Sequence, residues 1–121
     1  MKHCMVVDDS DVVRKVARRL FETMNFMVSE AENGQDALER CRARMPELLL
    51  VDGHMPVMTG TDFLVALRIE KEGKTPYVIY CTSENDPDDI ARAFSVGANN
   101  YILKPFDREA LVGKLQEAGF R

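Results

Sequence analysis

The sequence predicts an α/β fold in which five parallel strands form a doubly wound sheet with helices on both faces. Two observations lead to this prediction. Short apolar runs alternate with longer segments whose apolar residues recur at helical spacing along the 121 residues. No repeat, linker or low-complexity stretch interrupts the alternation. Strand–helix–strand units of this kind form right-handed crossovers, and the strand order 2-1-3-4-5 is the expected topology.

Five apolar runs are predicted to be the strands. They cover residues 4–7, 26–28, 48–51, 77–81 and 101–103. The third run is continuously apolar, which indicates burial on both faces of the sheet. In the expected order the first and third strands are neighbours, and a crevice opens beyond their carboxyl ends.

Capping and turn residues predict where the five helices begin and end. The predicted starts are Ser10 or Asp9, Asn33-Gly34, Gly60-Thr61, Asp86-Pro87 and Asp107. Asp86-Pro87 is the strongest signal, because a capping carboxylate precedes a proline in the first turn. The first helix should run to about Met24, the second must stop before Pro46, and Gly97 should end the fourth.

Composition favours one globular domain over residues 1–121, with 45% hydrophobic and 30% charged residues. No apolar run approaches the roughly 20 residues that span a bilayer, and an apolar strand beginning at Cys4 leaves no room for a signal peptide. Three well-separated cysteines argue against a disulfide framework or a zinc site and favour a reducing cytoplasm. A net charge of −4 argues against nucleic acid as a partner.

Polar side chains follow four of the predicted strands. Asp8 and Asp9 follow the first strand, Asp52 the third, Thr82 the fourth and Lys104 the fifth. The carboxyl ends of parallel strands share one edge of a sheet, so these side chains should converge there. Taken singly, each is an ordinary helix cap or turn residue. Together they indicate a shared site.

Three neighbouring carboxylates repel one another, and a hard cation such as Mg²⁺ removes the conflict. A carboxylate can also act as a nucleophile toward a phosphoryl group. Asp52 is the candidate nucleophile because it stands alone at a central strand end, and Asp8 and Asp9 are the better metal ligands. Lys104 and Thr82 could contact phosphoryl oxygens.

Four stretches carry a resemblance to a known family. They are Val6–Ser10, Leu50–Pro56 with Gly60, Cys81–Ser83 and Tyr101–Phe106. In these stretches, and in their spacing, the chain resembles response-regulator receiver domains of the chemotaxis, or CheY-like, type. The resemblance covers the whole chain. It implies a flavodoxin-like three-layer sandwich and a stand-alone receiver with no output domain, which signals rather than acting as an enzyme.

The resemblance implies a role for each matching residue. Asp52 would accept the phosphoryl group from a histidine kinase or histidine phosphotransferase. Asp8, Asp9 and Asp52, with the backbone carbonyl of His54, would hold Mg²⁺. Lys104 would contact the phosphoryl group.

The resemblance also implies a conformational switch. Thr82 would move toward the phosphoryl group while the Tyr101 ring turns inward, and the bond from Lys104 to Pro105 would be cis. The face formed by the fourth helix, fifth strand and fifth helix would then bind a downstream protein.

Other residues flank the expected site. They are Gly53, His54, Ser83, Glu84 and Pro105. Gly53 should leave its loop unusually free to move. We also expect His54 and Glu84 to meet across the mouth of the site, where a histidine would make loss of the phosphoryl group depend on pH; the alternative is a solvated His54.

A basic strip on the first helix and two other functions remain open from the sequence. Arg14, Lys15, Arg18 and Arg19 form either a solvated face or a docking surface for an acidic partner. An aspartate-nucleophile phosphohydrolase would usually carry a second acid where His54 stands. A binding module independent of phosphorylation would not need the complete set of site residues. A flavin-binding domain would need a phosphate loop rich in serine and threonine after the first strand.

Overall fold

The computed structural model describes residues 1–83 and 85–120, in which five strands alternate with five helices. The elements are β1 (His3–Val7), α1 (Asp11–Thr23), β2 (Met27–Ala31), α2 (Gly34–Ala43), β3 (Leu48–Asp52), α3 (Gly60–Arg68), β4 (Tyr77–Thr82), α4 (Pro87–Ser95), β5 (Asn100–Leu103) and α5 (Arg108–Glu117). All pairs of neighbouring strands are parallel, in the order β2-β1-β3-β4-β5. The predicted fold class and strand order are therefore confirmed.

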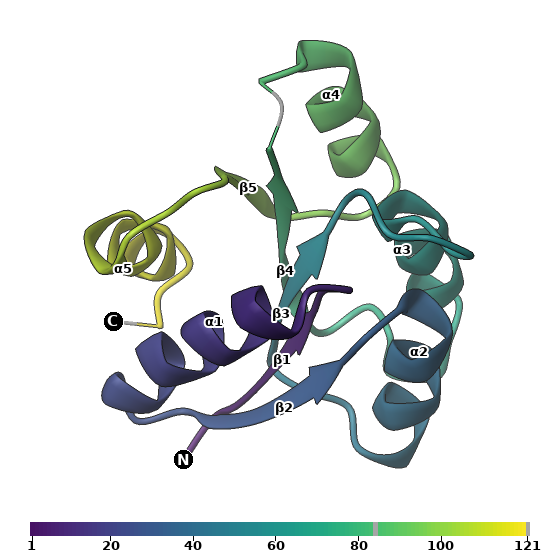
Figure 1. The fold of residues 1–121 in the computed structure, drawn as a ribbon. Coiled ribbons are helices and arrows are strands. Elements are labelled where there is room, and N and C mark those ends of the chain that lie inside the picture. Colours follow the sequence, from purple (N-terminus) through teal and green to yellow (C-terminus); the bar gives the residue numbers. More distant parts are fainter. Residues whose placement is uncertain (84, 121) are drawn as a thin grey trace.

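The sheet has a hydrophobic core on each face. Figure 1 shows α1 and α5 on one side of the sheet and α2, α3 and α4 on the other. Phe21 and Leu111 belong to the first core, and Phe63 and Ala93 to the second. Residues of β3 alternate between the two cores, and its five residues are all buried. The continuous apolar run is thus buried on both faces, as predicted.

Helix starts follow the predicted capping chemistry. The Ser10 hydroxyl, rather than Asp9, accepts a hydrogen bond from the backbone N–H of Val13 and caps α1. Asn33, Asp86 and Asp107 cap α2, α4 and α5 through their side chains. The cap of α3 lies one residue before the predicted start, because Thr59 forms a reciprocal capping box with Asp62.

Strand β2 is longer than predicted and extends to Ala31. Ser29 and Glu30 are polar, so the apolar run ends before the strand does. Both pair in register with β1, and Glu30 forms ion pairs with Arg14 and Arg18 of α1. A polar residue continues this edge strand because the helix above it provides a charged partner.

The topology brings the functional segments together. Asp52 and Thr82 are the last residues of β3 and β4, Asp8 follows β1, and Lys104 follows β5. All four therefore lie at the carboxyl edge of the sheet, as expected. No helix among the described residues is long and apolar enough to cross a membrane.

Candidate phosphoacceptor and metal site

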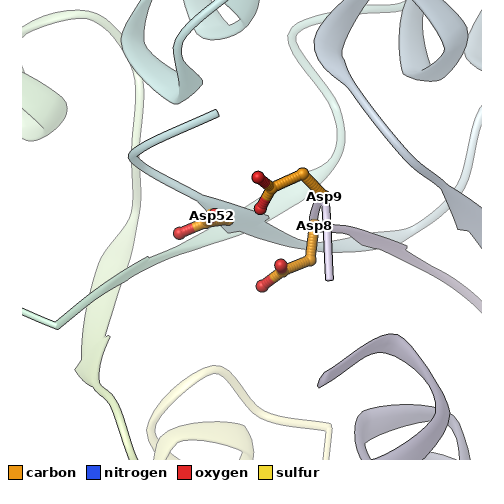
Figure 2. Close-up of side chains that lie close together, drawn as sticks. All are labelled: Asp8, Asp9 and Asp52. Carbon is orange, nitrogen blue, oxygen red and sulfur yellow. The ribbon is translucent and has the colours of Figure 1, made fainter. Parts of the chain in front are cut away.

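Three carboxylates cluster at the carboxyl edge of the sheet. One oxygen from each of Asp8, Asp9 and Asp52 lies within 4.8 Å of the others. Figure 2 shows Asp8 and Asp9 projecting beside Asp52. Asp8 and Asp52 are buried, whereas Asp9 is exposed. The structure thus joins the three acids that the sequence singled out, with one of them facing solvent.

Lys104 is the cation that faces this cluster. Its Nζ lies 2.7 Å from Oδ2 of Asp8 and 3.3 Å from Oδ1 of Asp52. Burial favours the neutral amine, but the hydrogen bond to Asp8 and the charge of Asp52 outweigh it, so the pKa of Lys104 is raised. Lys104 therefore remains a cation between two buried carboxylates.

The negative charge of Asp52 is unfavourable in the folded protein. Burial and then repulsion by Asp8 raise the pKa of its carboxyl group, and Lys104 offsets only part of the effect. The backbone N–H of His54 lies 3.5 Å from Oδ1 of Asp52, which is too long for a strong hydrogen bond. A desolvated, weakly bonded carboxylate next to a cation is well prepared to react as a nucleophile.

The carboxylate oxygens of this cluster are suitable ligands for Mg²⁺. The ion prefers oxygen ligands, and it commonly uses one or two carboxylates while keeping several waters. Asp8 and Asp52 offer buried carboxylates, and Asp9 adds one from the solvent side. The single ammonium of Lys104 does not balance three acids, so the cluster has room for additional positive charge.

Arg14 supports Asp8 from behind. Its Nη1 donates to the backbone carbonyl of Asp8 at 2.7 Å, and its guanidinium pairs with Glu30 and Asp11. The backbone N–H of Ser10 also donates to Asp8 Oδ1 at 2.9 Å. Spacing on the first helix placed Arg14 in a surface strip, but the residue is buried.

Only part of the predicted basic strip is therefore available to a partner. Arg18 pairs with Glu30 at 2.6 Å, while Lys15 and Arg19 are exposed. The surface strip therefore does not include Arg14, because Glu30 of the edge strand pairs with Arg14 and Arg18. Docking of an acidic partner on the remaining basic residues stays a prediction.

Thr82 and Tyr101 lie on neighbouring strands. Thr82 is fully buried, and its Oγ1 lies 3.4 Å from Nε2 of His54. Tyr101 is half-buried, with its ring edge-on to Phe94 of α4 and under the ammonium of Lys114 of α5. The Lys104–Pro105 bond is cis, as the family resemblance implied. Ser83 and Pro105 are exposed beside the site.

Gly53 is hydrogen-bonded on both sides, which counts against the expected freedom of its loop. Its N–H donates to the Cys81 carbonyl at 2.8 Å, and its carbonyl accepts from Gly60 at 3.1 Å. A Cβ at Gly53 would lie 2.5 Å from Cζ of Tyr80 and closer still to its hydroxyl. Glycine is needed here because a large buried side chain from β4 occupies the space.

His54 has a partner that the sequence did not indicate. Its Nε2 lies 3.5 Å from Oδ2 of Asp89 in the first turn of α4. Oδ1 of Asp89 accepts a hydrogen bond of 3.0 Å from the Tyr80 hydroxyl. Glu84, the expected partner of His54, lies outside the described residues. Tyr80 has the pattern of a core residue and Asp89 that of a helix-start acid, so no motif pointed to either.

The comparisons with known proteins identify the family. The family model described as "Response regulator receiver domain" matches residues 4–116. The chain therefore belongs to the response regulator receiver domains, and the resemblance seen in the sequence is confirmed. Receiver domains of this type are signalling proteins, which favours a role in two-component signalling over a phosphohydrolase.

Individual relatives are chemotaxis proteins. The chain is 32% identical over 114 residues to chemotaxis protein CheY of Pseudomonas aeruginosa, covering 93% of this chain and 92% of the relative. Chemotaxis protein CheY1 of Helicobacter pylori is 33% identical with the same coverage. The structure of CheY4 of Vibrio cholerae superposes with a TM-score of 0.92 at 30% identity, covering 97% of this chain and 98% of that one.

Proposed function

We propose that this protein is a response regulator of a two-component phosphorelay, in which Asp52 accepts a phosphoryl group from a histidine kinase or histidine phosphotransferase with Mg²⁺. One observation supports this most directly. A buried Asp52 faces two further acids and the Lys104 ammonium at the carboxyl edge of the sheet. The unpaired and buried cysteines are compatible with work in a reducing cytoplasm.

In the proposed reaction an oxygen of Asp52 attacks the phosphorus atom. The O–P bond forms as the P–N bond to the donor imidazole breaks, and the donor leaves with that electron pair. Asp8, Asp9, Asp52 and the backbone carbonyl of His54 would hold Mg²⁺, which when bound neutralises charge on the phosphoryl oxygens. Lys104 already faces Asp52 at 3.3 Å and would contact another of these oxygens.

Thr82 and Tyr101 would transmit the change. The Thr82 hydroxyl would donate to the phosphoryl group, and the Tyr101 ring would follow inward. Because the ring contacts Phe94 of α4 and Lys114 of α5, its movement would alter the surface of both helices. The added charge on Asp52 would thus shift the equilibrium between two conformations of Thr82 and Tyr101.

The α4–β5–α5 face offers apolar groups for a downstream protein. Phe94 is 43% exposed and Leu103 36% exposed, next to the half-buried Tyr101. A shallow pocket lined in part by Tyr101, Phe106 and Lys114 lies on the same face. We expect a protein partner to bind here, with an affinity that depends on whether Asp52 is modified.

Incubation with acetyl phosphate and Mg²⁺, followed by mass spectrometry, tests the proposal. The native protein should gain the mass of one phosphoryl group, and Asp52→Asn should gain none. Asp9→Asn should need more Mg²⁺, whereas the exposed Asp88→Asn serves as a control and should behave like the native protein. Native protein that stays unmodified would contradict the proposal. Repeated turnover of a phosphate ester without a retained adduct would instead indicate a phosphohydrolase.

A further inference from the structure

A chain of three side chains connects the sheet, α4 and the mouth of the site. The Tyr80 hydroxyl in β4 donates to Oδ1 of Asp89 at 3.0 Å, and Oδ2 of Asp89 lies 3.5 Å from Nε2 of His54. The same Nε2 lies 3.4 Å from the Thr82 hydroxyl. The His54 imidazole therefore lies between α4 and the hydroxyl proposed to contact the phosphoryl group.

The first member of this chain is rigid. Tyr80 is 1% exposed, a side chain on Gly53 would collide with its ring, and its Cε1 lies 3.1 Å from where a Cβ on Gly60 would be. Both glycines belong to the segment that leads from Asp52 into α3. A tyrosine with so little space keeps its hydroxyl in one place, so the carboxylate of Asp89 is fixed as well.

The second member lacks a full set of hydrogen bonds. Within the part of the chain that the structure describes, Oδ2 of Asp89 is buried and has no hydrogen-bond partner. Nε2 of His54 lies 3.5 Å away and is a potential donor to it. A buried carboxylate oxygen without a donor is unfavourable, so a proton on Nε2 gains energy by pointing toward Asp89.

We propose that Asp89, fixed by Tyr80, is a positioning residue that holds the His54 imidazole beside Thr82 and so lengthens the life of the phosphoryl group on Asp52. The proposal rests on the function proposed above. His54 is only two residues from Asp52, and its side chain is 52% exposed at the entrance. Held in place, the ring covers the Thr82 side of the site; released, it turns into solvent and admits water.

Two measurements test this proposal separately. In the unmodified protein at one pH, NMR of the imidazole nitrogens reports His54, since the only other histidine is His3. Asp89→Ala and Tyr80→Phe should both shift the His54 signals, and the matched exposed control Asp88→Ala should not. Unchanged His54 signals in both variants would overturn the positioning role, whether or not Asp52 can be phosphorylated.

The second measurement is the rate of phosphoryl loss after removal of acetyl phosphate. Asp89→Ala and Tyr80→Phe should lose the group about two- to ten-fold faster, the range expected for one lost hydrogen bond. In a His54→Ala background the same changes should have no further effect. Native-like rates, slower loss, or an equal acceleration without His54 would each overturn the proposal. Failure of the native protein to form an adduct would count against the function, not against the His54 contact.

Discussion

Val57 lies in the loop between Asp52 and α3 and is the clearest source of local strain. Its φ of 72° places a β-branched residue in the left-handed region. That conformation costs an L-residue about 1–2 kcal/mol, and asparagine tolerates it far better. The Val57 side chain is 97% exposed, so its replacement removes almost no buried apolar surface. We therefore expect Val57→Asn to raise the free energy of unfolding by about 1 kcal/mol.

Urea and thermal unfolding measure the difference. For a domain of this size, about 1 kcal/mol corresponds to a rise in Tm of roughly 4 °C. Val12→Asn is the matched control, because Val12 is 71% exposed but lies in α1 with helical backbone angles. The control should change stability by less than about 0.5 kcal/mol. If Val57→Asn is no more stable than native protein, or if both variants change equally, the strain argument is refuted.

Two further predictions concern buried ionisable groups. Because the pKa of Asp52 is raised in the folded protein, its charge costs stability as pH rises above the ordinary value of 3.8. Asp52→Asn should therefore be more stable than native protein at about pH 7 without Mg²⁺, and the difference should shrink toward about pH 4. Thermal melts at both pH values measure this difference, and a variant less stable than native protein at about pH 7 would contradict the prediction. For His3, burial and then Arg44 lower the pKa below 6.5, so stability should be lost as pH falls through that value. His3→Gln should flatten the decline between about pH 7 and pH 5, and an unchanged pH profile would exclude His3 as its cause.

The sequence was sufficient for the fold because a sheet covered on both faces needs continuous apolar strands. The run from Leu48 to Val51 and the alternation around it define a doubly wound arrangement. The end of β2 escaped prediction because Glu30 continues the strand by pairing with Arg14, a contact between elements distant in sequence.

The main site residues could be predicted for a similar reason. Parallel strands bring their carboxyl ends to one edge, so Asp8, Asp52 and Lys104 converge wherever the helices pack. The contacts of His54 could not be predicted in this way. They depend on how α4 is placed over the sheet and on the space that Tyr80 occupies, and neither is encoded in local spacing.

Borohydride trapping of the acetyl phosphate adduct, followed by peptide sequencing, identifies the residue that carries the phosphoryl group. Reduction of an aspartyl phosphate leaves homoserine at the residue that carried the phosphoryl group. If Asp52 is the phosphoacceptor, homoserine appears at position 52 in protein treated with Mg²⁺ and at no position when Mg²⁺ is chelated. Homoserine at Asp8 or Asp9, or none at any position, would contradict this assignment.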